Sequence, residues 1–209
     1  MLPRNPEAGE TPAPASELEQ RVVEISARIM WRAFPYFAWR YGERGRAFGR
    51  SDAGFLVTLL SLDEPMAKAQ VNWLAGVLAP RGMPSLLLET QLESLGRTLR
   101  RLQGTGGDRL LALAAGLRGR RTMAISESTI ATCEALSFAA ASGIRRRRGI
   151  GRLIAAAVAD RSTGLGEFDD ALVRWLATAD PQDSAWLDGC RAAHAHAAQS
   201  VLPQGGGPE

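Results

Sequence analysis

The sequence contains few of the residues on which common catalytic and metal sites depend. Its 209 residues include two cysteines, two histidines and one lysine, Lys68. The cysteines show no CxxC spacing, so neither a disulfide framework nor a zinc finger is indicated. The motifs HExxH, GxSxG, ExxH, DDxxD and GxxxxGK[ST] are all absent, and nothing positive points to an enzyme, a di-iron bundle or a P-loop. The sequence therefore predicts no catalytic residue and no metal site.

Long apolar runs are also missing, because no stretch of 18 apolar residues occurs. A transmembrane helix needs about 20 such residues, so no membrane span is expected. Residues 1–15 are rich in proline and lack the apolar core of a signal peptide. We expect a cytoplasmic protein with a disordered leader over residues 1–15, one helical domain over residues 16–202 and a disordered tail over residues 203–209.

The apolar residues that are present favour helix over strand. Hydrophobic residues make up 45% of the chain, and leucine and alanine outnumber the β-branched types, a balance that favours helices. No segment alternates apolar and polar residues as a strand does. The pattern predicts an all-α bundle of about eight or nine helices, a number that also fits a globin-like arrangement.

Several helix boundaries can be assigned from single residues. Ser16 is a predicted N-cap, Pro35 ends the first helix near Phe34, and Asp183 belongs to the start of the last one. Three glycines within residues 42–49 predict a loop between two helices. The clearest helix follows Pro84 and carries leucines in steps of four and three, a seam that needs a partner helix within the chain or in a homodimer: Leu88, Leu92, Leu95, Leu99 and Leu102.

Residues 31–50 form the most distinctive segment, because they hold seven of the 13 aromatic residues and five arginines. Aromatic walls with guanidinium groups at the rim suit a planar anionic ligand such as a tetrapyrrole, a nucleotide or a flavin. The alternative is a packed core with arginine stems lying over the rings. The candidate ligand-binding residues are Trp31, Tyr36, Phe37, Trp39, Arg40, Tyr41 and Arg44.

Cys190 and His194 are four residues apart on the last predicted helix. A thiolate and an imidazole at this spacing share one face, so they are candidates to attach a tetrapyrrole, with His194 as an axial haem ligand. The alternative is a buried cysteine beside a histidine that is hydrogen-bonded at the edge of the core. The sequence does not identify a cofactor.

Positive charge is concentrated in the middle of the chain. Residues 97–161 carry 13 arginines and four acids, whereas the whole chain has a net charge of only +3. Such a segment can bind a polyanion, remain solvated or pair with the acidic ends of the chain. Nucleic acid is not the favoured partner, since residues 149–160 offer few side chains able to read bases. The candidate polyanion-binding residues are Arg118, Arg120, Arg121, Arg145, Arg146, Arg147 and Arg148.

Three hypotheses about function follow. The first is a non-enzymatic helical binding or regulatory protein that contacts a protein partner or holds a small planar or apolar ligand near residues 31–50. The second is a globin-like carrier or sensor of a tetrapyrrole, either haem or a bilin, attached through His194 or Cys190. The third is a polyanion or nucleic-acid binder that uses the arginines of residues 97–161.

Overall fold

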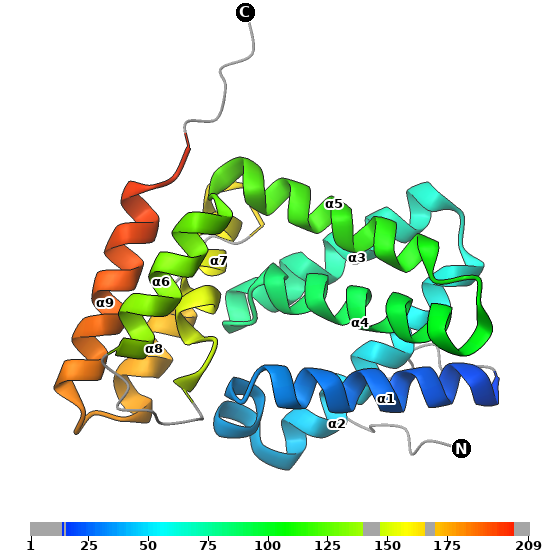
Figure 1. Cartoon of the computed structure of the whole chain (residues 1–209), viewed down its shortest axis with the longest axis horizontal. Helices are drawn as coiled ribbons and strands as arrows, with labels where there is room; N and C mark the ends of the chain where they lie inside the picture. Colours follow the sequence, from blue (N-terminus) through cyan, green and yellow to red (C-terminus); the bar gives the residue numbers. More distant parts are fainter. Residues whose placement is uncertain (1–13, 15, 140–146, 166–169, 203–209) are drawn as a thin grey trace, which may run out of the picture. The chain divides into compact units, whose positions relative to one another are not determined.

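The computed structural model describes residues 14, 16–139, 147–165 and 170–202. Within them the chain forms nine α-helices and no strand, which confirms the predicted all-α fold (Figure 1). A globin-like arrangement stays a prediction. None of these helices has the length and apolar character that crossing a membrane requires. The helices are α1 (Glu17–Ala33), α2 (Tyr36–Thr58), α3 (Glu64–Leu78), α4 (Ser85–Gln103), α5 (Asp108–Ala124), α6 (Glu127–Ala139), α7 (Ile150–Ser162), α8 (Asp170–Ala179) and α9 (Ser184–Gln199), with short 3-10 helices η2 (Leu59–Ser61) and η3 (Ala79–Arg81).

The helices fall into two compact units. Unit 1 comprises Met1–Leu74 and Leu88–Gly116, and unit 2 comprises Ala75–Leu87 and Leu117–Glu209. Helices α3, α4 and α5 each contribute residues to both units. Each unit has its own set of buried apolar side chains.

Unit 1 is built on the pairing of α1 with α2. The seam leucines of α4 are also buried: Leu88, Leu92, Leu95 and Leu99 are each at most 4% exposed. The side-chain amide of Gln91 on α4 donates a 2.7 Å hydrogen bond to Ser26 Oγ on α1, and both side chains are buried. The seam is therefore covered within the chain, so it no longer argues for a homodimer.

Unit 2 packs α6, α7 and α9 against one another. Every residue of α7 from Ile150 to Asp160 except Arg152 is buried. Glu134 on α6 caps the start of α7, because its carboxylate accepts hydrogen bonds from the backbone N–H of Gly149 at 2.8 Å and of Arg152 at 3.2 Å. An acid at a helix N-terminus satisfies free N–H groups and complements the helix dipole.

The loop predicted at residues 42–49 is wrong in all but one residue. Helix α2 runs through this segment, and only Gly42 has non-helical dihedral angles, φ 54° and ψ −145°. Gly45 is buried and helical, and a side chain there would bring a Cβ atom 2.5 Å from Tyr41 Cβ. Glycine at position 45 therefore serves close packing within the helix, which a simple count of glycines does not distinguish from a loop.

A buried carboxylate in unit 2 holds the start of α4. Asp160 on α7 is 3% exposed, and it accepts a 2.7 Å hydrogen bond from the backbone N–H of Ser85 and another from Ser85 Oγ. Burial raises the pKa of Asp160 to about 6 and outweighs the hydrogen bonds from Ser85 and the charges of Arg120 and Arg121, which lower it. The carboxyl group therefore takes up a proton more readily in the folded chain than in the unfolded chain.

This difference predicts how Asp160 affects stability at different pH. Because its folded pKa lies above the ordinary value of 3.8, protonation favours the folded state, and its contribution to the free energy of unfolding declines as pH rises from about 4 to about 6. Urea unfolding of the wild type and of Asp160→Asn should show the wild type losing stability relative to the variant over this range. The prediction would be contradicted if the free energies of unfolding of the wild type and the variant differed by the same amount at both ends of this pH range.

Candidate functional site

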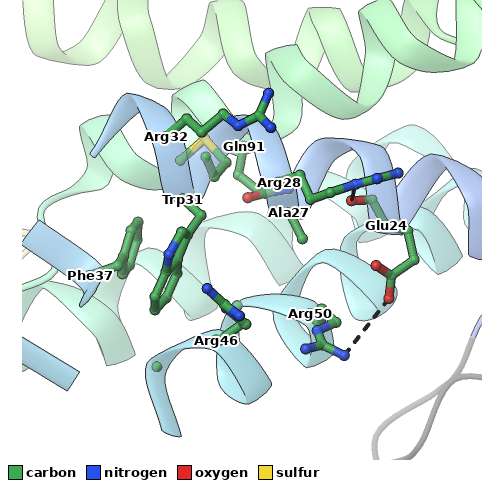
Figure 2. Close-up of a pocket in the computed structure, with 12 residues that line it drawn as sticks. Glu24, Ala27, Arg28, Trp31, Arg32, Phe37, Arg46, Arg50 and Gln91 are labelled. Carbon is green, nitrogen blue, oxygen red and sulfur yellow. Dashed lines mark hydrogen bonds and ion pairs between the residues drawn. The ribbon is translucent and has the colours of Figure 1, made fainter. Parts of the chain in front are cut away.

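A pocket of about 390 Å³ in unit 1 is lined by residues of α1, α2 and α4. We call it the Trp31 pocket. Figure 2 shows Trp31 and Phe37 at one end, Glu24 and Arg50 at the other, and Arg46 between them. The volume falls within the range of about 300–1,000 Å³ that is typical of small-molecule sites.

Local backbone features open the space between α1 and α2. Pro35 separates the two helices, since a proline cannot continue α1. Gly42 kinks α2 with a φ of 54°, which residues bearing a side chain rarely adopt. Two further glycines, Gly45 and Gly49, line the pocket. A Cβ atom at Gly49 would meet no other atom within 4 Å, so the lack of a side chain there leaves room that a larger residue would occupy.

Four arginines and one acid contribute to the lining: Arg28, Arg32, Arg46, Arg50 and Glu24. The arginines form two pairs with a spacing of four residues, one on α1 and one on α2, so each pair shares a helix face. Glu24 lies 3.9 Å from Arg50, measured from Oε1 to Nη1. Positive charge therefore exceeds negative charge around the pocket, and an anion is the complementary ligand.

Arginines also lie over aromatic rings on this side of unit 1. The guanidinium carbon of Arg46 is 4.6 Å from the centre of the Trp31 ring, a geometry that orients the guanidinium group and reduces its mobility. A second cluster contains Tyr36, Tyr41 and Arg40, which donates a hydrogen bond to the Tyr36 hydroxyl. Burial raises the pKa of Tyr36 well above its ordinary value of 10.0, so the phenol stays neutral.

The seven predicted ligand-binding residues separate into two groups. Trp31 and Phe37 line the pocket, whereas the other five do not belong to its described lining: Tyr36, Trp39, Arg40, Tyr41 and Arg44. The sequence prediction missed Arg28, Arg32, Arg46 and Arg50 as ligand-binding residues. The spacing of four could have identified both pairs, Arg28 with Arg32 on the first predicted helix and Arg46 with Arg50, the second only if residues 42–49 had been assigned to a helix.

Cys190 and His194 lie on α9 in unit 2, and neither belongs to the described lining of the Trp31 pocket. Cys190 is buried, and burial raises the pKa of its thiol to about 12. A neutral thiol is a poor ligand, because metals bind the thiolate. No group of three His, Cys, Asp or Glu side chains in the described residues could hold a metal ion.

The seven arginines proposed for polyanion binding differ in exposure. Arg118 and Arg148 are exposed and Arg120 is half-buried. Arg121 is buried and pairs with Glu127 at 2.9 Å. Arg147 is buried and pairs with Asp180 and Asp183. Arg145 and Arg146 lie outside the described residues. At least two of the seven side chains are thus engaged inside unit 2.

Comparison of this chain with family models, curated proteins and solved structures finds no match.

Proposed function

We propose that this protein is a non-enzymatic binding protein that holds a small, flat ligand in the Trp31 pocket. The observation that carries the proposal is a pocket of about 390 Å³ with aromatic rings at one end and arginines along its walls. Trp31 and Phe37 offer flat apolar surface, and Met30 and Ala27 extend it. Sites that bind small molecules combine such walls with a few polar groups that fix orientation.

The composition of the lining favours binding over catalysis. Its described residues include one carboxylate, Glu24, and no Ser, Cys, His or Lys side chain that could act as a nucleophile. General acid–base chemistry commonly uses two groups with separated pKa values, and Glu24 has no second acid or histidine beside it in the lining. Retention of a ligand is the activity that this set of residues supports best.

Gly49→Leu is expected to block the pocket without unfolding the protein. A Cβ atom at Gly49 would meet no other atom within 4 Å, and leucine is a better helix former than glycine, by somewhat less than the roughly 0.8–1.0 kcal/mol that separates glycine from alanine. Titration with anilinonaphthalene sulfonate, an aromatic anion that fluoresces in apolar surroundings, should show saturable binding to the wild type. The variant should bind at least about tenfold more weakly, because its side chain occupies the space of the ring.

The matched control is Gly76→Leu on α3. A Cβ atom at Gly76 would likewise meet no other atom within 4 Å, and this residue does not belong to the described pocket lining. The control should bind the dye as the wild type does. Absence of saturable binding to the wild type, or equal binding by Gly49→Leu and the wild type, would contradict the proposal.

A further inference from the structure

We infer that the ligand of the Trp31 pocket is a flat aromatic acid with two negative charges, which Arg46 and Arg50 bind. This inference rests on the proposed function and adds the chemical class of the ligand. It follows from the unused hydrogen-bond donors of the two arginines, from their spacing on α2 and from the balance of charge in the lining.

The guanidinium groups of Arg46 and Arg50 have unused donors in the described part of the chain. Their closest carboxylate oxygens belong to Glu43, at 3.6 Å from Arg46, and Glu24, at 3.9 Å from Arg50. Both distances exceed the 2.7–3.2 Å or so of an N–H···O hydrogen bond. Each guanidinium group has about five N–H donors in a planar fork that matches a carboxylate. The two existing ion pairs therefore leave N–H donors of both guanidinium groups available to a ligand.

The spacing of the two arginines defines the separation of the two acidic groups. Positions 46 and 50 are four residues apart on the helical part of α2 beyond Gly42, so the residues are about 6 Å apart along the axis, slightly more than one turn. Two like charges at this spacing repel each other. An anion that contacts both removes this repulsion, and two carboxylates across one aromatic ring have a comparable separation.

The Trp31 end of the pocket is suited to an aromatic ring of the ligand. Trp31 already holds the Arg46 guanidinium at 4.6 Å from its ring centre, so this donor is oriented before the ligand arrives. Phe37 lies at the same end of the pocket (Figure 2) and offers its face or edge to a second ring. A ring packed here places its acidic groups along the wall formed by α2.

The balance of charge favours two negative groups over one. Four arginines and one glutamate in the lining amount to a net charge of +3, which a dianion reduces to about +1. Glu24 lies beside Arg50 at the far end of the pocket (Figure 2). Its negative charge therefore repels the second acidic group of the ligand. Removal of this carboxylate should therefore strengthen the binding of a dianion.

The test is calorimetric titration of the full chain with three compounds that share one ring system: naphthalene-1,4-dicarboxylate, naphthalene-1-carboxylate and the dimethyl ester of the dicarboxylate. We expect affinity to fall in this order, by about tenfold at each step, since a hydrogen bond to a charged group contributes about 1.5–3 kcal/mol. Arg46→Gln and Arg50→Gln should each weaken the dicarboxylate by about tenfold, whereas Glu24→Gln should strengthen it.

Arg21→Gln is the matched control, because Arg21 is an exposed arginine on α1 that does not belong to the described lining. It removes the same charge and should leave affinity within about twofold of the wild type. If the ester binds as tightly as the dicarboxylate and Gly49→Leu weakens both, the pocket stands and the inference about charge is wrong. If the dicarboxylate binds best but the Arg46 and Arg50 variants bind it equally well, the assignment of these residues is wrong. If none of the compounds binds, the proposed function fails together with the inference.

Discussion

Replacement of Arg147 by alanine is expected to lower the free energy of unfolding by about 2–3 kcal/mol, less than when both partners of an ion pair are buried, because Asp180 and Asp183 are partly exposed. Arg147 is 1% exposed. Its guanidinium group donates hydrogen bonds to Asp183 at 2.6 Å and to Asp180 at 2.7 Å. On one face it lies 4.2 Å from the centre of the Trp186 ring. Alanine would leave two carboxylates facing each other with no cation between them.

The effect should extend to the start of α9. Asp183 is the N-cap of this helix and accepts a 3.0 Å hydrogen bond from the backbone N–H of Trp186. Hydrogen bonds from Arg147 and from this N–H lower the pKa of Asp183, so the carboxylate stays charged and in place at neutral pH. Without Arg147, the guanidinium group that offsets the repulsion of Asp183 by Asp180 is lost. The loss therefore combines an ion pair, a ring contact and part of a helix cap.

The neighbouring residue provides the control. Arg148 is exposed, so Arg148→Ala should change stability by no more than about 0.5 kcal/mol. Urea unfolding followed by far-ultraviolet circular dichroism measures both variants. Equal stability of the two variants would show that the buried pairing of Arg147 contributes nothing beyond a surface charge.

The sequence predicted the features that depend on neighbouring residues. Ser16 accepts a hydrogen bond from the backbone N–H of Glu19, and the Glu19 carboxylate accepts one from the backbone N–H of Ser16. The break at Pro35 and the start of the last helix near Asp183 are also confirmed. A cap or a proline acts within one turn of its own position, so the chemistry of a few consecutive residues determines the outcome.

Features that join distant residues could not be predicted in the same way. Asp160 holds Ser85 from 75 residues away, and Glu134 caps α7 from a different helix. The run that includes Arg147 and Arg148 reads as a uniform charged segment, yet one side chain is buried and the other is exposed. The packing of helices in unit 2 determines which arginine meets Asp180 and Asp183, and no spacing within the run contains that information.

The candidate site was likewise predicted in part. Residues 31–50 were predicted as the place where rings and arginines gather, and Trp31 and Phe37 do line a pocket. The four arginines of the lining were not among the predicted ligand-binding residues, and Arg46 was not placed on a helix face because residues 42–49 were assigned to a loop. With α2 helical beyond Gly42, Arg46 and Arg50 fall on one face with a spacing of four, and that register decides which guanidinium groups reach the pocket.

Replacement of Gly151 by alanine is expected to destabilise unit 2 by about 3 kcal/mol, at the upper end of the range for overpacking in a protein core. A Cβ atom at this position would lie 2.1 Å from the carbonyl oxygen of Cys133 and 2.5 Å from Glu134 Cα. Both atoms belong to the backbone of α6, so no change of side-chain rotamer relieves the contact. Helices α6 and α7 would have to separate, which also weakens the cap that Glu134 provides to the backbone N–H of Gly149.

Replacement of Gly119 by alanine should have the opposite effect and stabilise the protein. Gly119 lies on α5 in unit 2, and a Cβ atom there would meet no other atom within 4 Å. Alanine in the middle of a helix is more stable than glycine by about 0.5–1 kcal/mol, so Gly119→Ala should raise the midpoint of urea unfolding while Gly151→Ala lowers it. The two variants carry the same added methyl group and differ only in what that group meets. If both variants raise the midpoint, the backbones of α6 and α7 are not in close contact at Gly151, and the packing described for unit 2 is wrong.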